Sequence, residues 1–379
     1  MQPSGSRSSA WTHFCSSSCG HGLSRRGLLA AAVAAPALAA PMLARRAEAA
    51  VPAVARKQVI DVHHHYVPPE YVKLAGENLN AAGVFAFPPY ARWTPQATLD
   101  EMDRSNVCTA VLSISTPGIW FGDVAQGRAV ARVCNEYAAR MQADHPGRFA
   151  QFAAIPLPDA DGALAEIGHG LDTLRAQGVG LMTSYDIPGR GGVYLGDQAF
   201  WPAYEELNRR RAVVYVHPSN PSCCAKIADA VNASFIEFPT DTTRTVLSLM
   251  YSGVFTRYPD IRWVFSHNGG TLPMLLARVM QLGHAPADAA RVKPDDIPKL
   301  VRGLYFECAN AASQAAVGAI RQWADPTHLM FGSDYPYVPV MATETMLQER
   351  GLDAHLLQAV LRDNALRLMP GLAGLGHKV

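Results

Sequence analysis

Several patterns that mark common protein classes are missing from this sequence of 379 residues. The seven cysteines include no C-x-x-C pair, so the sequence predicts neither a zinc finger nor a disulfide framework. The 33 Lys and Arg residues are matched by 32 Asp and Glu residues, and no basic stripe or polybasic block predicts binding to nucleic acid or an anionic membrane. The apolar fraction of 49% is instead typical of a globular enzyme with a large core.

Cysteine usage also argues against a disulfide-stabilised fold. Five of the cysteines lie after residue 50, and an odd number cannot all pair within one chain, so we expect mostly free thiols. The adjacent Cys223 and Cys224 could form a redox pair. Strained disulfides between neighbours are uncommon, however, and we favour two buried thiols at this position.

The first 49 residues have the features of an export signal. Ser24-Arg25-Arg26-Gly27-Leu28-Leu29 is a twin-arginine pattern, an Ala-rich stretch follows, and Ala47-Glu48-Ala49 is an A-x-A cleavage signal. A membrane anchor is the rival interpretation, but the stretch is short and two prolines interrupt it. We therefore expect a signal peptide over residues 1–49, export by the twin-arginine pathway to the periplasm or the medium, and no stable membrane anchor after processing.

Strand-like and helix-like segments alternate over residues 50–379. Eight apolar, β-rich runs are predicted as strands, at 57–62, 107–115, 149–155, 179–182, 213–216, 261–266, 304–306 and 329–331. A proline-rich loop with Pro68, Pro69, Pro88 and Pro89 is predicted after the first strand. Helical periodicity follows it and lies between and after the later strands, at 94–104, 124–144, 162–176, 198–210, 242–251, 272–282, 313–323 and 356–368. This order predicts an α/β fold of the (β/α)8 (TIM) barrel type. A doubly wound open sheet is the competitor, but no glycine-rich phosphate loop follows the first strand.

The first predicted strand ends in His63-His64-His65. Side chains two residues apart leave a strand on the same face, so His63 and His65 should point one way and His64 the other. Two imidazoles on one side of a strand end can chelate a divalent ion, and imidazole nitrogen suits zinc. Asp61, two residues earlier, could support this site or cap the strand.

Three later predicted strands also end in groups that bind metals or transfer protons. The fifth ends in His217-Pro218, the sixth in Ser266-His267-Asn268-Gly269-Gly270, and the eighth in Gly332-Ser333-Asp334-Tyr335-Pro336. In a barrel these carboxyl ends converge on the face where active sites are built. Three imidazoles and one carboxylate make a plausible zinc site with a position left for water or substrate.

These motifs resemble the metal-dependent amidohydrolase superfamily, and within it the branch of the aminocarboxymuconate-semialdehyde decarboxylases. The segment from Glu237 to Arg244, with His217-Pro218-Ser219-Asn220-Pro221, is most similar to 6-methylsalicylate decarboxylases. The resemblance implies a (β/α)8 barrel with one divalent metal per chain, Zn²⁺ or alternatively Mn²⁺. By position it implies His63, His65, His217 and Asp334 as metal ligands, and His267 and Asp334 as catalytic acid/base groups.

The sequence departs from the superfamily pattern in informative ways. Dinuclear members bridge two metals with a carbamylated lysine after strand four, but no lysine lies between Lys73 and Lys226, which favours one metal. His64 is an unusual extra imidazole, and its role stays open. Asn268 stands where a small residue is more usual.

Candidate substrate contacts are weaker predictions. The resemblance places Arg92 where a guanidinium contacts the substrate carboxylate, although a solvated surface arginine is the simpler interpretation. For Arg244 we favour a local structural pairing with Asp241. Three aromatic side chains, Trp120, Phe121 and Tyr185, could wall an aromatic substrate or belong to the core.

The sequence as a whole predicts a metal-dependent, non-oxidative decarboxylase of a small aromatic or unsaturated carboxylic acid similar to 6-methylsalicylate. The alternative is a hydrolase in which a metal-activated water attacks a lactone, ester or amide, because one fold hosts many chemistries. The expected partner is a small carboxylic acid. A homodimer is one option for the oligomeric state, which the sequence leaves open.

Overall fold

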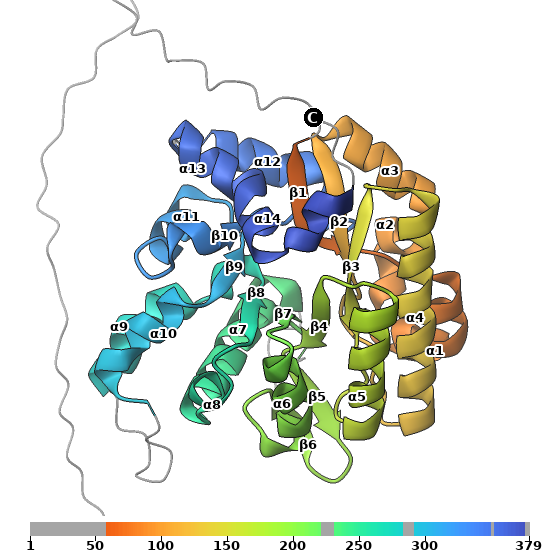
Figure 1. Cartoon of the computed structure of the whole chain (residues 1–379), viewed down its shortest axis with the longest axis horizontal. Helices are drawn as coiled ribbons and strands as arrows, with labels where there is room; N and C mark the ends of the chain where they lie inside the picture. The colour runs from red at the N-terminus through yellow and green to blue at the C-terminus, as the bar shows by residue number, and fades with distance from the viewer. Residues whose placement is uncertain (1–57, 221–230, 283–291, 350–351, 376–379) are drawn as a thin grey trace, which may run out of the picture. The chain divides into compact units, whose positions relative to one another are not determined.

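The computed structural model describes residues 58–220, 231–282, 292–349 and 352–375. Its main sheet is built from eight parallel strands: β1 (Val59–His65), β2 (Val107–Ser113), β3 (Phe149–Ala154), β4 (Gly178–Met182), β7 (Val213–His217), β8 (Arg262–Phe265), β9 (Tyr305–Glu307) and β10 (Leu329–Met330). They pair in the order β1-β2-β3-β4-β7-β8-β9-β10, as in a (β/α)8 barrel seen from the side in Figure 1. The eight strands predicted from the sequence are confirmed.

The barrel closes where the segment after β10 meets β1. The amide of Val62 donates to the carbonyl of Phe331 (3.0 Å), and that of His65 donates to the carbonyl of Tyr335 (2.8 Å). Between them, the amide of Asp334 donates to the carbonyl of His63 (2.9 Å). These bonds run beyond the short β10 strand, so the seam is held by backbone that carries the predicted site residues.

Helices surround the strands (Figure 1). They are α1 (Pro69–Ala81), α2 (Pro88–Ala91), α3 (Pro95–Arg104), α4 (Val124–Asp144), α5 (Ala160–Gly168), α6 (Trp201–Arg209), α7 (Ala233–Tyr251), α8 (Val254–Arg257), α9 (Leu272–Leu282), α10 (Ile297–Arg302), α11 (Gln314–Ile320), α12 (Val340–Gln348), α13 (Ala354–Gln358) and α14 (Asn364–Leu368). Several begin at side-chain caps that satisfy free backbone N–H groups. Thr94 caps α3 and Asp123 caps α4 in this way.

The barrel interior is a packed core. Strand side chains fill it, including Val62, Phe152 and Tyr215, and the rings of Phe152 and Tyr215 stack at 5.1 Å. Leu368 and Leu372 from the C-terminal segment belong to the same cluster. The guanidinium of Arg262, the first residue of β8, donates to the carbonyl of Leu368 (2.9 Å). The chain end therefore packs at the amino-terminal end of the barrel, opposite the predicted site.

Three elements differ from the sequence prediction. The proline-rich stretch after β1, predicted as a loop, contains α1 and α2, and both begin with proline, whose fixed φ suits the first helical turn. Helix α7 begins at Ala233 rather than near residue 242 and continues through Pro239. A hairpin of β5 (Ser184–Ile187) and β6 (Gly191–Tyr194), visible at the lower edge of Figure 1, follows β4 and was not predicted.

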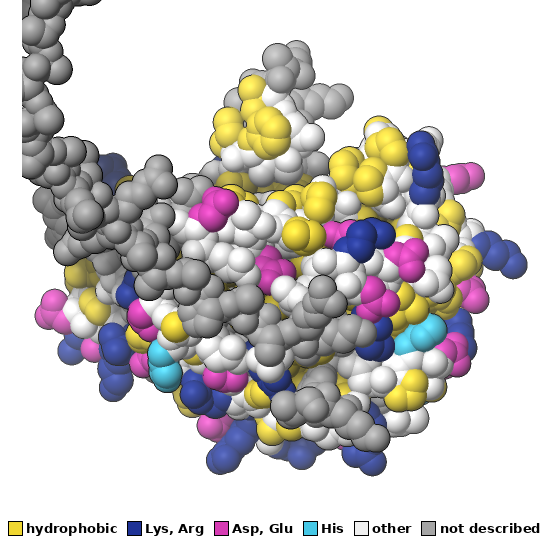
Figure 2. Space-filling view, turned by 90° about the horizontal axis from the view of Figure 1, so that it is seen from above, with side chains coloured by type: hydrophobic (Ala, Val, Ile, Leu, Met, Phe, Trp, Pro, Cys, Tyr) yellow, Lys and Arg dark blue, Asp and Glu magenta, His cyan; other side chains and the backbone are white. Residues whose placement is uncertain are grey.

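Cysteine state and surface charge agree with the sequence. Cys108, Cys134 and Cys308 are buried free thiols, whereas Cys223-Cys224 and the predicted signal peptide lie outside the described residues. The face shown in Figure 2 carries acidic and basic side chains intermixed, without a continuous basic stripe. Within the described ranges, no helix has the length and apolar character needed to cross a membrane.

Candidate metal centre

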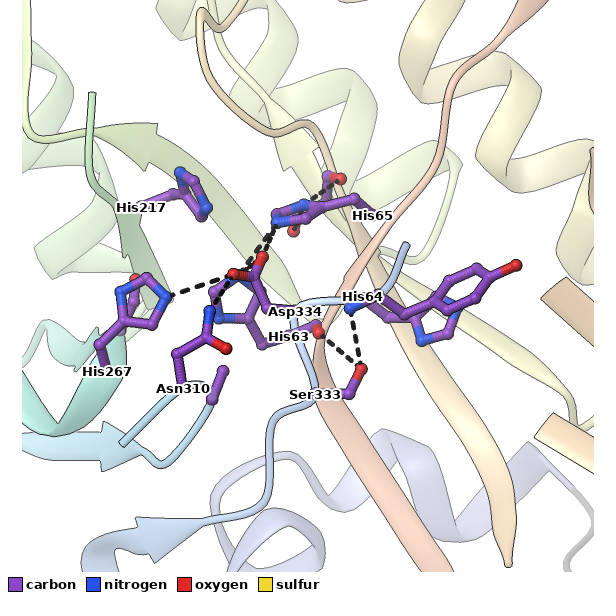
Figure 3. A network of polar contacts seen from close by, with 12 residues as sticks. His63, His64, His65, His217, His267, Asn310, Ser333 and Asp334 are labelled. Carbon is purple, nitrogen blue, oxygen red and sulfur yellow. Dashed lines mark hydrogen bonds and ion pairs between the residues drawn. The ribbon is translucent and has the colours of Figure 1, made fainter. Parts of the chain in front are cut away.

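The four side chains predicted as metal ligands meet at the carboxyl end of the barrel (Figure 3). Each of His63, His65, His217 and Asp334 offers one ligand atom, and these atoms all lie within 4.8 Å of one another. The Nε2 atoms of His63 and His65 are 2.9 Å apart, and each lies 3.1 Å from Oδ1 of Asp334. Donor atoms from β1, β7 and the segment after β10 thus face one point.

Each imidazole is held by its other ring nitrogen. Nδ1 of His63 lies 2.7 Å from a carboxylate oxygen of Glu307, Nδ1 of His65 lies 3.1 Å from the carbonyl of Ser113, and Nδ1 of His217 lies 2.8 Å from the carbonyl of Pro218. An acceptor at Nδ1 fixes the tautomer with its lone pair on Nε2, as metal-ligating histidines require. Ligands about 2.0–2.1 Å from one tetrahedral ion are about 3.3 Å apart, which is near the observed spacing. The set fits a divalent metal.

Strand β1 divides its three histidines as predicted. His63 and His65 point into the cluster, while His64 points to the other side of the strand (Figure 3). There Nδ1 of His64 lies 2.9 Å from Asp61, and its ring stacks on Tyr335 at 4.7 Å. The pairing register of β1 with β2 shifts between Asp61 and His64. Val62 lies within this interval, and its side chain packs in the barrel interior.

Asp334 is held in an unusual backbone conformation. Its φ is 68°, in the left-handed region that non-glycine residues rarely adopt and that often occurs at functional sites. One oxygen, Oδ1, faces the histidines, and the other, Oδ2, accepts from the amide of Asn310 (2.5 Å). Oδ2 is therefore engaged by Asn310, and Oδ1 is left available to a metal.

Electrostatics of the cluster favour a proton on His63. Burial alone lowers the pKa of His63, but the charges of Glu307 and Asp334 outweigh it and raise that pKa to about 10. Burial lowers the pKa of His65, and burial with the neighbouring His65 and His63 lowers the pKa of His217 well below its ordinary value. For Asp334, burial works in the opposite direction, but His63 and His267 hold its pKa well below the usual range.

Glu307 is a site residue that the sequence interpretation missed. Its carboxylate is fully buried at the end of β9 and contacts His63, the backbone amide of His267 (2.9 Å) and that of Ala309 (2.7 Å). Burial by itself raises its pKa, but the charge and hydrogen bond of His63 bring the pKa below its ordinary value. A carboxylate closing an apolar strand was the signal for it. Gly332 is required nearby, because a Cβ there would collide with Glu307 and His63.

His267 lies beside the cluster in the place expected of an acid/base group. Its Nε2 is 3.6 Å from Oδ2 of Asp334, and its Nδ1 is buried without a hydrogen-bond partner among the described residues. The side chain is 9% exposed. Its φ of 56° and that of Asn268, 53°, place both in the left-handed region directly after β8. Nε2 of His267 thus faces Asp334, while Nδ1 has no hydrogen-bond partner among the described residues.

The candidate aromatic wall lies in one cavity. Trp120, Phe121 and Tyr185 line a space of about 610 Å³, together with Met182 and Ser219. Met182 pairs with His217 in the strand register, and Ser219 follows His217 by two residues, so the cavity adjoins the ligand set. Because all three rings line this cavity, we favour the interpretation that they form a wall of the substrate site rather than part of the core.

The two candidate arginines differ in their contacts. Arg92 is exposed at the end of α2, and no hydrogen bond or ion pair seen among the described residues joins it to the four ligand atoms. Its contact with a substrate carboxylate stays a prediction. Arg244 lies 3.6 Å from Glu237 and 4.0 Å from Asp241, in accord with the local pairing favoured from the sequence.

A family model described as amidohydrolase matches residues 60–370. The chain belongs to the amidohydrolase family. The resemblance inferred from the strand-end motifs is therefore confirmed, and the matched range contains all four candidate ligands and, apart from Val59, all residues of the eight barrel strands.

Curated relatives of this amidohydrolase are decarboxylases. Decarboxylase yanB of Aspergillus niger is 36% identical over 329 residues, which cover 82% of this chain and 87% of that protein. The 6-methylsalicylic acid decarboxylase acuB of Aspergillus aculeatus is 36% identical over 327 residues, covering 83% of this chain and 96% of that protein. Both relatives are named as carboxy-lyases, the class predicted from the sequence.

A solved structure with the same fold carries a metal. A dihydroxybenzoic acid decarboxylase from Polaromonas sp., with bound manganese and the inhibitor 2-nitroresorcinol, matches with a TM-score of 0.73 and 20% identity. The match covers 83% of this chain and 97% of that chain. At this identity the likeness shows the shared amidohydrolase barrel.

Proposed function

We propose that this amidohydrolase is a metal-dependent, non-oxidative decarboxylase of a small aromatic carboxylic acid of the 6-methylsalicylate type. The observation that carries the proposal is the convergence of three histidine ring nitrogens and one aspartate oxygen on one point, with His267 beside them. The curated relatives of the chain are decarboxylases. The proposed reaction exchanges the carboxylate of the substrate for a proton and releases carbon dioxide.

His63, His65, His217 and Asp334 would hold one divalent ion. We favour Zn²⁺ because imidazole nitrogen and a carboxylate suit it, with Mn²⁺ as the alternative that the manganese-bound Polaromonas enzyme suggests. When bound, the metal supplies a Lewis acid that holds the oxygens of the substrate and stabilises negative charge. Asn310 and Glu307 keep the ligand groups oriented through their own hydrogen bonds.

His267 is the proposed source of the proton. Its Nε2 faces Oδ2 of Asp334, and that oxygen is already engaged by Asn310 rather than by the ligand histidines. A protonated His267 can deliver the proton to the ring carbon that bears the carboxylate. The carbon–carbon bond then breaks, its electron pair returns to the ring, and carbon dioxide leaves.

The cavity of about 610 Å³ beside His217 is the proposed site for the substrate ring. Its volume lies within the range of about 300–1,000 Å³ that is usual for small-molecule pockets. Trp120, Phe121 and Tyr185 offer aromatic faces to a planar acid, in edge or offset contact. Residues 1–49 are proposed as a twin-arginine signal that sends the folded enzyme to the periplasm or the medium.

The test is turnover of 6-methylsalicylate in deuterated water. We expect carbon dioxide and a product with one deuterium at the carbon that carried the carboxylate, measured by mass spectrometry and proton NMR. A chelator should abolish the activity, and Zn²⁺ or Mn²⁺ should restore it. Hydrolysis of an ester or lactone with no carbon dioxide from any aromatic acid would refute the decarboxylase and favour the hydrolase.

A further inference from the structure

Asp61 is a fully buried carboxylate in β1 that accepts four hydrogen bonds. Oδ1 accepts from the backbone amides of His63 (3.1 Å) and Ser333 (3.0 Å). Oδ2 accepts from the hydroxyl of Ser333 (2.6 Å) and from the imidazole of His64 (2.9 Å). A buried charge is costly unless hydrogen bonds compensate it, so a complete set of donors indicates a fixed arrangement.

The four donors come from the two sides of the barrel seam. His63 and His64 belong to β1, whereas Ser333 precedes Asp334 in the segment after β10. Strand β10 has only two residues, and its ladder with β9 ends at Met330, so the segment that carries Asp334 is joined to β1 by separate backbone hydrogen bonds. Asp61 adds side-chain bonds at the place where the strand ladder is incomplete.

The connection bears directly on the candidate ligands. Asp61 accepts a hydrogen bond from the backbone amide of His63. It accepts another from the backbone amide of Ser333, the residue next to Asp334. Asp334 has a φ of 68°, a conformation that persists only where its surroundings enforce it. Its amide also donates to the carbonyl of His63, so both ligands are held in one local frame.

We propose that Asp61 and Ser333 form a seam clamp, a pair of positioning residues that sets the separation of the metal ligands His63 and Asp334. His64 serves as the fourth donor to the clamp, which explains an extra imidazole on the side of β1 away from the metal. The clamp rests on the proposed metal centre but assigns residues that contact neither metal nor substrate.

Metal affinity of matched variants tests the clamp. Ser333→Ala removes one hydroxyl without changing charge, and Asp61→Asn replaces the carboxylate by an amide. Glu166→Gln is the control, because Glu166 is also a buried carboxylate, but it accepts from Arg132 and Asn135 between α4 and α5, away from the seam. Zn²⁺ dissociation constants are measured by chelator competition on the full chain, and the visible spectrum of the Co²⁺-loaded protein reports ligand geometry.

We expect Zn²⁺ affinity to fall about tenfold in Ser333→Ala and about 100-fold in Asp61→Asn, the range found when groups that orient metal ligands are replaced. The Co²⁺ spectrum should change in both. Glu166→Gln should lose thermal stability yet keep the wild-type affinity and spectrum. If Asp61→Asn does not fold, Ser333→Ala decides.

Two results would overturn the clamp, and a third would remove its basis. Wild-type affinity and spectrum in Ser333→Ala and Asp61→Asn would show that the ligands are held without it. An equal loss in Glu166→Gln would show that general destabilisation weakens the metal site. A wild-type chain that binds no divalent metal would refute the metal centre itself, and the clamp with it.

Discussion

Replacement of His267 by asparagine should separate proton transfer from metal binding. His267 has a φ of 56°, where alanine is strained but asparagine is tolerated, so His267→Asn preserves the backbone better than His267→Ala. The change removes the only titratable group of this side chain. The four candidate ligand atoms and the hydrogen bond from Asn310 to Asp334 remain.

The expected loss follows from what the ring does. A general acid contributes about 10²–10⁴-fold to a rate, which corresponds to about 2.7–5.4 kcal/mol in the activation barrier. His267 lies 3.6 Å from Asp334, too far for a strong hydrogen bond, so its removal should change metal affinity little. We expect turnover to fall at least about 100-fold while metal content stays at about one ion per chain.

Carbon dioxide release and metal content are measured on the same samples. Added imidazole should restore part of the activity of His267→Asn. His328→Asn is the control for the substitution itself, because His328 stacks on Tyr305 at 3.8 Å and lies before β10, whereas Asp334 lies after it, and this variant should retain full turnover. Loss of the metal from His267→Asn would instead make His267 a ligand, and unchanged turnover would remove it from the mechanism.

Three further predictions address the cluster and the leader. His63→Ala and His65→Ala should each lose most of the bound metal, measured by elemental analysis, whereas His64→Ala should keep it because that ring lies on the opposite face; equal loss in all three would contradict the strand geometry. Below pH about 10 the metal-free protein holds a proton on His63, so metal uptake at pH 8 should release about one proton and affinity should rise with pH, as calorimetry in two buffers would show. Glu307→Gln removes the main charge that raises this pKa and should reduce the release; an unchanged release would refute that assignment. Deletion of residues 1–49 should prevent export, and a truncated chain that still reaches the periplasm would disprove the signal.

The strands and ligands could be predicted because their signals are local. An apolar run followed by His or Asp marks a strand end, and parallel strands bring such ends together whatever the intervening loops do. The alternation of His63, His64 and His65 needed only the period of a strand. These features survive the irregularity in β1, because the pairing with β2 is regular again at His64 and His65, and the side chains of His63 and His65 still point into the cluster.

Other features depend on contacts that the sequence does not display. Pro239 reads as a helix boundary, but α7 continues through it, with the carbonyl of Pro239 accepting from Thr243 and Thr271. Glu307 closes β9, but its role depends on contacts with His63 and with the backbone amide of His267, which come from distant parts of the sequence. The four donors to Asp61 come from both sides of the barrel seam, so its role emerges only after closure.

Closure also has a consequence for the order in which the chain can fold. The apolar interior at the base of the barrel is completed by Leu368 and Leu372, which follow all eight strands in the sequence. A nascent chain that lacks them leaves Val62 and Phe152 without part of their packing, and exposed apolar surface favours association with other chains. The base is therefore sealed only after the segment that follows β10 has been synthesised. For the same reason, a C-terminal truncation that reaches α14 should yield aggregated protein during expression, even though it leaves every candidate ligand in place.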